Sequence, residues 1–328
     1  MGFDERRLIE NLLAPLAQNS EGAFGLADDA AVLTPESGTE HVISVDTIVS
    51  GVHFRPDDAA DLVAKKALRV NVSDIAAKGA EPFAWFMSLG LPKDHETQLP
   101  PDWIAKFVQG LAQDQDKYGL GLYGGDTVRS PGGVVISITM IGRCNAGASV
   151  RRFTARDGDL LYVSGTMGDA ALGLHIEGEA GFAPEHREFL AQSFLLPDPP
   201  VALAPSIRNF ANAAMDISDG LVSDLGLMCE ASGLGARVLI DDVPLSEAAS
   251  QALLHTSATM TDILAGGDDY QILAAVPMKL GAQFEISAAA AGHHVTNIGR
   301  TEEVANGVRF IDARGQLQTF PSTTFRHF

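Results

Sequence analysis

Short apolar segments of strand length alternate with helical segments along the chain. His41–Thr47 and Phe83–Leu91 have the length and composition of strands, whereas Ala59–Lys78 spaces its apolar residues as on one face of a helix. Leu160–Val163 begins a second series of the same kind. Alternating strands and helices form sheets covered by helices, so we predict a protein of the α/β and α+β classes.

The polar, turn-rich segment 143–158 interrupts this alternation near the middle of the chain. The 328 residues are enough for two domains, each with its own core. We therefore predict an N-terminal α/β domain over residues 1–148 and a C-terminal α+β domain over residues 149–328.

Composition argues against several classes of partner. The net charge of −19 does not suit a nucleic-acid surface, because phosphate backbones attract Lys and Arg. No run of about eighteen apolar residues occurs, so we expect no membrane span. The first residues predict a charged amphipathic helix rather than a signal peptide. Cys144 and Cys229 form no CxxC pair and suggest no disulfide framework, which favours a cytoplasmic location.

Many aspartates share one context, in which an apolar run leads into a turn rich in Gly, Ser or Thr. They are Asp28, Asp29, Asp46, Asp126, Asp216, Asp219, Asp268 and Asp269. Asp74 differs, because it falls inside the predicted helix, where Asn71 and Lys78 share its face. Carboxylates at strand ends can point into the crevice in which α/β folds bind ligands.

This set of aspartates fits a magnesium site. Mg²⁺ prefers oxygen ligands and usually takes one or two carboxylates together with waters and substrate phosphates. No Cys/His cluster has zinc spacing. Each aspartate taken singly also fits a helix cap or a turn, as Asp219 before GLVSDL and Asp169 before AALGLHI illustrate. Spacing alone leaves both interpretations open.

The glycine-rich segments do not match the common nucleotide motifs. Gly119–Gly124 fits GxGxxG, but it follows a predicted helix and precedes a strand, the reverse of a dinucleotide fingerprint. The chain also lacks a P-loop. Gly124–Thr127 and Gly266–Asp269 are candidate turns for phosphate approach. Candidate phosphate contacts, which also fit a solvated loop, are Arg151, Arg152 and Arg156.

Seven motifs in order resemble those of the thiamine-monophosphate kinase family, over nearly the whole chain. They are GLADDAAV, SVDTIVSGVHF, KKALRVNVSDIAAKGAEP, YGGDT, VSGTMGDAALGL, MDISDGLVSDL and AGGDDYQIL. That family is part of the aminoimidazole-ribonucleotide synthetase superfamily, whose members bind ATP without a P-loop. The resemblance implies an N-terminal domain that dimerises through its sheet and a C-terminal domain that closes over the nucleotide.

The resemblance also implies an activity: transfer of the γ-phosphoryl group of ATP to thiamine monophosphate, with several Mg²⁺ ions and without a phospho-enzyme. The implied magnesium ligands are Asp29, Ser44, Val45 (through its main chain), Asp46, Asp74, Asp126, Asp216 and Asp219, of which Asp46, Asp74, Asp126 and Asp216 are the expected catalytic set. The implied ATP contacts are Tyr118, Gly125, Asp126, Arg152 and Ser218. The implied thiamine-phosphate contacts are His53, Asp268 and Phe325.

The chain departs from the family pattern at three of these motifs. Asp268 stands where Glu is common, so its carboxylate has a shorter reach; Ala27 replaces Gly, and Val45 replaces Thr. Two alternatives are other superfamily chemistry and a non-catalytic binder. The first typically uses cysteines near a terminus, where this chain has none, and the second need not retain the metal ligands.

Overall fold

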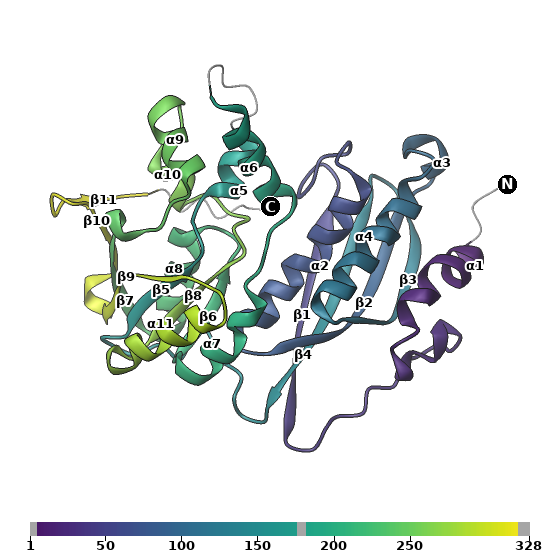
Figure 1. Cartoon of the computed structure of the whole chain (residues 1–328), viewed down its shortest axis with the longest axis horizontal. Coiled ribbons are helices and arrows are strands. Elements are labelled where there is room, and N and C mark those ends of the chain that lie inside the picture. Colours follow the sequence, from purple (N-terminus) through teal and green to yellow (C-terminus); the bar gives the residue numbers. More distant parts are fainter. Residues whose placement is uncertain (1–4, 176–181, 321–328) are drawn as a thin grey trace. The chain divides into compact units, whose positions relative to one another are not determined.

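The computed structural model describes residues 5–175 and 182–320. The chain folds as two compact units (Figure 1). The first consists of Met1–Ile75 and Glu81–Gly147, and the second of Ala76–Ala80 and Ala148–Phe328. The described regions contain no helix with both the length and the hydropathy needed to span a bilayer.

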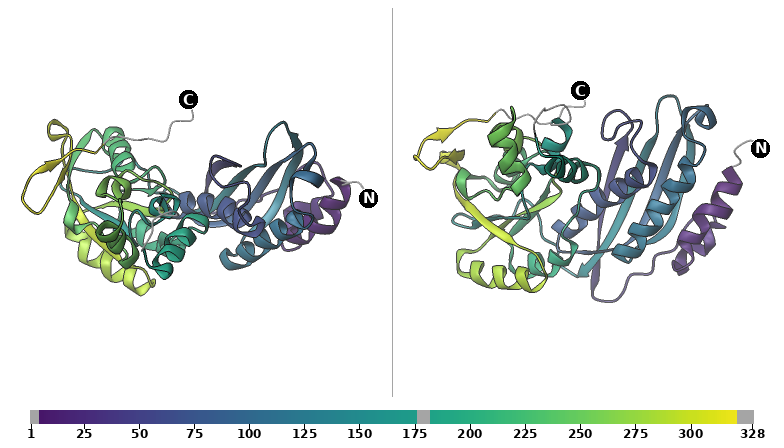
Figure 2. Two further views of the ribbon diagram at one scale, coloured as in Figure 1. Left: turned by 90° about the horizontal axis from the view of Figure 1, so that it is seen from above. Right: turned by 45° about the horizontal axis from the view of Figure 1, so that its top comes forward.

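The first unit is a four-stranded sheet with two long helices on one face (Figure 2). The strand order is β1 (Thr39–Val49), β4 (Val135–Asn145), β2 (Glu81–Pro92) and β3 (Gly121–Ser130). β2 and β3 are parallel, whereas β4 is antiparallel to both of its neighbours. The two long helices are α2 (Ala60–Ala77) and α4 (Trp103–Tyr118).

The covered face of this sheet is the core of the first unit. Trp85, Phe107 and Ile138 are fully buried there. A buried ion pair joins the two helices, because the Arg69 guanidinium donates to both carboxylate oxygens of Asp114 at 2.6 and 3.0 Å. The remaining elements are α1 (Glu5–Leu8), η1 (Ile9–Leu13), η2 (Ala14–Ala17), η3 (Glu21–Leu26) and α3 (His95–Gln98).

The second unit is a mixed sheet of seven described strands. Their order is β11 (Leu317–Gln318), β10 (Val308–Ile311), β7 (Leu234–Leu239), β9 (Val295–Glu303), β5 (Leu160–Ser164), β8 (Gln271–Val276) and β6 (Ala213–Ile217). The α-helices are α5 (Asp169–His175), α6 (Pro184–Leu195), α7 (Ala204–Phe210), α8 (Leu221–Ser232), α9 (Glu247–His255), α10 (Met260–Leu264) and α11 (Gly281–Ala290).

Helices lie on both sides of this second sheet (Figure 2). Alternation along β5 reflects the two layers, because Leu161 and Val163 join one apolar cluster and Tyr162 joins the other. The segment Ala76–Ala80 also packs here, and its Lys78 ammonium donates to the Ala214 carbonyl at 2.9 Å.

The expected fold class is confirmed by this architecture. The predicted strands are present, but several are longer than their apolar runs: His41–Thr47 becomes Thr39–Val49. These differences arise because the ends of strands are fixed by pairing with neighbours rather than by apolar content alone.

Candidate active site

One group of candidate residues joins β1 to α2. The hydroxyl of Ser44 donates a short hydrogen bond to Oδ2 of Asp74, and the main-chain N–H of Asp46 donates to Oδ1 of Asn71 at 3.0 Å. Side chains alternate along a strand, so Ser44 and Asp46 share the face that α2 covers. The predicted shared face of Asn71 and Asp74 is confirmed, whereas Lys78 lies just past the end of the helix.

Burial and the negative charge of Asp74 raise the pKa of Asp46 to about 6. Two nearby carboxylates repel one another, and burial strengthens this repulsion. A divalent cation would relieve it, and a donor set made only of oxygens is the kind that Mg²⁺ takes. The residues present therefore fit a magnesium ion.

The side chain of Val45 points the other way. It is 58% exposed on the open face of the sheet, as is Ile43 at 62%. The Val45 side chain is therefore directed away from Ser44 and Asp46, and a ligand atom from this residue would have to come from its main chain.

A cavity of about 210 Å³ in the first unit gathers a second group of candidates. Asp28, Asp29 and Asp126 line it, together with Tyr123 and Gly125. Its apolar wall comes from Ile9, Leu13, Ala23, Leu26, Phe86 and Leu122. Carboxylates beside an apolar wall suit a cation-bound phosphate attached to an apolar group.

Two expected turns are strand interior in the structure. Asp46 lies within β1 rather than at its end, and Gly124–Thr127, including Asp126, lies within β3. Gly125 is required because an added Cβ would lie 1.9 Å from the carbonyl oxygen of Met87 on β2. Close pairing of two strands, rather than approach to a phosphate, explains this glycine.

His53 and Tyr118 are held at other places in the first unit. Nδ1 of His53 accepts the main-chain N–H of Val49 at 3.1 Å, so in the neutral ring Nε2 carries the hydrogen. Tyr118 ends α4, and its half-buried ring lies 5.9 Å from the Arg69 guanidinium and 4.8 Å from the Lys117 ammonium.

In the second unit, Asp216 is a buried residue of β6, and the loop after this strand carries Ser218 and Asp219. The buried carboxylate of Asp224, in the first turn of α8, accepts the main-chain N–H groups of Ser218 and Asp219, each at 3.0 Å. Asp219 is therefore no helix cap, since Gly220 occupies that position. Burial, and then the charge of Asp219, raise the pKa of Asp224 to about 7.

Asp224 was not among the residues predicted from the sequence. Its place just after Gly220, at the start of an apolar helical segment, was the available signal, because a carboxylate there can reach main-chain N–H groups near the helix start.

The Gly266–Tyr270 loop is bound to the loop after β6. The N–H of Asp268 donates to Ser218 O and that of Tyr270 donates to Ile217 O, both at 2.8 Å. Gly267 must be small, because an added Cβ would lie 2.2 Å from Ser218 O. The half-buried carboxylate of Asp268 accepts a hydrogen bond from the Tyr270 hydroxyl at 3.0 Å.

Two buried aspartates stabilise neighbouring loops. Asp269 accepts the N–H of Gly168 with both oxygens, at 3.0 and 2.9 Å, and burial raises its pKa well above the usual value. Asp169 accepts the hydroxyls of Thr166 and Ser246. Asp169 is the first residue of α5 rather than its cap, and its carboxylate joins two loops.

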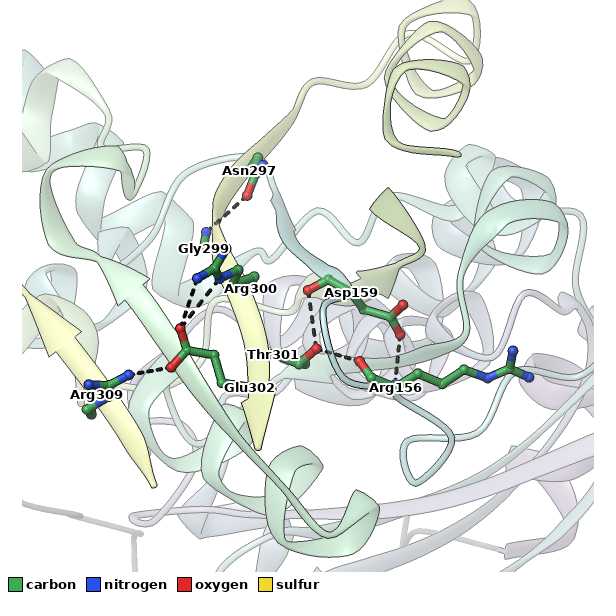
Figure 3. A network of polar contacts seen from close by, with 8 residues as sticks. All are labelled: Arg156, Asp159, Asn297, Gly299, Arg300, Thr301, Glu302 and Arg309. Carbon is green, nitrogen blue, oxygen red and sulfur yellow. Dashed lines mark hydrogen bonds and ion pairs between the residues drawn. The ribbon is translucent and has the colours of Figure 1, made fainter. Parts of the chain in front are cut away.

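The arginine-rich loop is exposed. Its main chain is bound at Arg156, whose N–H donates to Asp159 at 2.8 Å and whose carbonyl accepts the Thr301 hydroxyl (Figure 3). The side chains of Arg151, Arg152 and Arg156 reach solvent. Phe325 lies outside the described residues.

The described side chains do not form a complete metal site by themselves. Within residues 5–175 and 182–320, no three His, Cys, Asp or Glu side chains gather closely enough to hold an ion. Paired carboxylates assisted by a hydroxyl instead suit an ion whose remaining ligands are water and phosphate.

The chain belongs to the AIR synthase related proteins, whose N-terminal domain family matches residues 27–144 and whose C-terminal domain family matches residues 156–312. Within them it belongs to the thiamine-monophosphate kinase family. The thiamine-monophosphate kinase of Caulobacter vibrioides is 39% identical over 90% of this chain and 83% of its own.

Solved structures agree with this assignment. The crystal structure of thiamine-monophosphate kinase from Stenotrophomonas maltophilia is 33% identical, with a TM-score of 0.82 over 97% of this chain and 99% of its own. A structure described as AaThiL complexed with AMPPCP and TMP is 29% identical, with a TM-score of 0.78 over 100% of both chains.

Proposed function

We infer that this protein is an ATP-dependent kinase that phosphorylates thiamine monophosphate, with thiamine diphosphate and ADP as products. The observation that carries the inference is the Ser44, Asp46 and Asp74 arrangement, found in a chain 39% identical to a thiamine-monophosphate kinase. The complex of a related ThiL protein with AMPPCP and TMP supports the same pair of substrates.

Several Mg²⁺ ions would be held by oxygen ligands, and each unit contributes its own set. In the first unit these are Asp29, Ser44, the Val45 main chain, Asp46, Asp74 and Asp126, and in the second Asp216 and Asp219. When bound, the ions would neutralise phosphate charge. The raised pKa of Asp46 and the acidic cavity of the first unit support this role.

The chain's own residues would bind and orient the substrates. Tyr118, Gly125, Asp126, Arg152 and Ser218 are the proposed ATP contacts, and His53, Asp268 and Phe325 the proposed thiamine-phosphate contacts. Gly125 can contribute only main-chain atoms. Asp224 would hold the main chain of Ser218 and Asp219 in the geometry they need.

The transfer would be direct and in line. A phosphate monoester is already anionic near neutral pH, so the acceptor oxygen needs no strong general base. Orientation and charge stabilisation would therefore supply most of the rate. A labelled phosphoryl group found covalently on the protein during turnover would contradict direct transfer.

We further propose that the protein is a homodimer and acts in the cytoplasm. The open face of the first sheet carries the exposed side chains of Ile43 and Val45, an apolar surface of the kind that subunit contacts cover. Cys144 and Cys229 are buried and are not joined in a disulfide, as is usual in a reducing compartment.

The proposed activity is tested by product identification. The protein is incubated with Mg²⁺, ATP and thiamine monophosphate, with free thiamine and aminoimidazole precursors as control acceptors, and the products are identified by mass. We expect ADP and thiamine diphosphate only with thiamine monophosphate. Turnover of another acceptor alone would reassign the activity.

A further inference from the structure

The Gly266–Tyr270 loop carries an unusual backbone around the proposed substrate contact. Asp268 has φ +68° and Tyr270 has φ +48°, the left-handed region that residues other than glycine rarely adopt. Such a conformation is unfavourable for these residues and persists only where the surrounding structure imposes it.

Three sets of contacts impose that conformation. The N–H groups of Asp268 and Tyr270 are bound to the carbonyls of Ser218 and Ile217, and the Asp269 carboxylate between them is bound to Gly168. Because the main chain of Asp268 is held on both sides, only its side-chain torsions can still vary.

The Tyr270 hydroxyl restricts those torsions, because it donates to Oδ1 of Asp268 at 3.0 Å. The Tyr270 ring is 9% exposed and thus anchored, whereas Asp268 is half-buried. A carboxylate can accept several hydrogen bonds, so the bond from Tyr270 does not prevent Asp268 from binding a ligand.

We propose that Tyr270 is a positioning residue that fixes the Asp268 carboxylate for the thiamine-phosphate substrate. This inference rests on the proposed function and on the proposed role of Asp268. The Tyr270 hydroxyl orients a carboxylate that is one methylene shorter than the Glu common in the family. Because thiamine is cationic, an oriented carboxylate suits it, whereas ATP offers that carboxylate no cation.

The test compares four proteins: the parent, Tyr270→Phe, Asp268→Gly and the double variant. Glycine is chosen because it adopts φ +68° without strain. Tyr162→Phe is the matched control, because it removes another buried tyrosine hydroxyl of the second unit, which is bound to Glu285 at 2.7 Å. KM is measured separately for thiamine monophosphate and for ATP.

We expect Tyr270→Phe to raise KM for thiamine monophosphate about five- to tenfold, with KM for ATP changed less than about twofold. In the Asp268→Gly background the same substitution should add less than about twofold, because the two residues act as a unit. Tyr162→Phe should leave both KM values unchanged.

Two outcomes would overturn the inference. If Tyr270→Phe changed KM for thiamine monophosphate equally in both backgrounds, Tyr270 would not act through Asp268. An unchanged KM for thiamine monophosphate in Asp268→Gly would remove Asp268 from the substrate site. Absence of turnover in the parent would instead overturn the proposed function. If Tyr270→Phe does not fold, Tyr270→Leu replaces it, and its effect on KM for thiamine monophosphate is compared in the same two backgrounds.

Discussion

Ser44 on β1 donates its hydroxyl hydrogen to Asp74 on α2, and this contact fixes a carboxylate on a helix against a strand. Asp74 is thereby held near Asp46, whose pKa its charge helps to raise. The charge of Asp74 makes ionisation of Asp46 more costly, so a cation beside the two carboxylates would relieve this repulsion.

Asp74→Asn should lower turnover by about 100-fold or more, because it removes charge and a ligand oxygen at a rigid position. The measurement is kcat across a magnesium titration. Asp61→Asn is the matched control on the same helix, since Asp61 is paired at its surface with Lys65 at 3.8 Å. Activity of Asp74→Asn within a few-fold of the parent at saturating magnesium would contradict the role of Asp74.

His53→Asn should raise KM for thiamine monophosphate while the turn after β1 stays intact. An asparagine oxygen can accept the Val49 N–H that Nδ1 of the histidine accepts now, but it lacks the outer Nε2 donor. His53→Ala, which removes both, should show the same KM effect and also a lower unfolding temperature. If either variant altered the ATP KM alone, His53 would belong to the nucleotide site.

Gly125→Ala should destabilise the protein by about 3 kcal/mol, because the added methyl group collides with the Met87 carbonyl. Gly132→Ala is the control, since nothing lies within 4 Å of a Cβ at that position. Unfolding in urea measures both. Equal midpoints for the two variants would show that β3 can move away from β2 at no cost.

Asp169 provides a pH-dependent prediction. Burial raises its pKa, so the folded protein retains a proton above pH 4 that the unfolded chain has lost. Its contribution to stability is therefore present at low pH and is lost as the pH rises above 4 and through the raised pKa of Asp169. The side chain in Asp169→Asn does not ionise, so this variant should not lose stability at this position as the pH rises.

The difference in urea midpoint, parent minus Asp169→Asn, should accordingly fall as the pH rises above 4. Asp241→Asn, which changes an exposed carboxylate of the same unit, controls for overall charge. A midpoint difference that rises with pH would reverse the sign of this linkage.

Val45→Lys should yield monomers if the open face of the first sheet is the subunit contact. Burying a lysine without a partner is unfavourable, so the dimer dissociates while the unit stays folded. Light scattering gives the mass in solution. Leu254→Lys, at a position 73% exposed on α9, should leave the mass unchanged; a Val45→Lys protein that remained dimeric would place the contact elsewhere.

Much of the fold could be predicted from periodicity. The helix over Ala60–Ala77 and the strands at Leu160–Ser164 and Ala213–Ile217 match the apolar pattern closely, because most of their buried side chains are apolar. Gly124–Thr127 does not, since a GGDT sequence is typical of turns. Pairing with β2 makes it part of a strand, and no local pattern records that partner.

The candidate site was predicted less completely. The shared face of Asn71 and Asp74 follows from helical spacing, and the contacts to β1 agree with it. Asp224 and Asp269 were not recognised as residues that bind the main chain of loops, because the sequence does not show which aspartates are buried. What distinguishes them is the position of main-chain N–H groups that only the folded loops bring within reach.

β1 is an edge strand that pairs with β4 alone in the described sheet. Because side chains alternate, a slip of one residue would place Asp46 on the open face and turn Val45 toward α2. The contacts of Ser44 and Asp46 with α2 oppose this slip, so the residues proposed to bind magnesium also hold the strand in register. Substitutions there can therefore promote misregistered pairing and aggregation independently of any loss of catalysis.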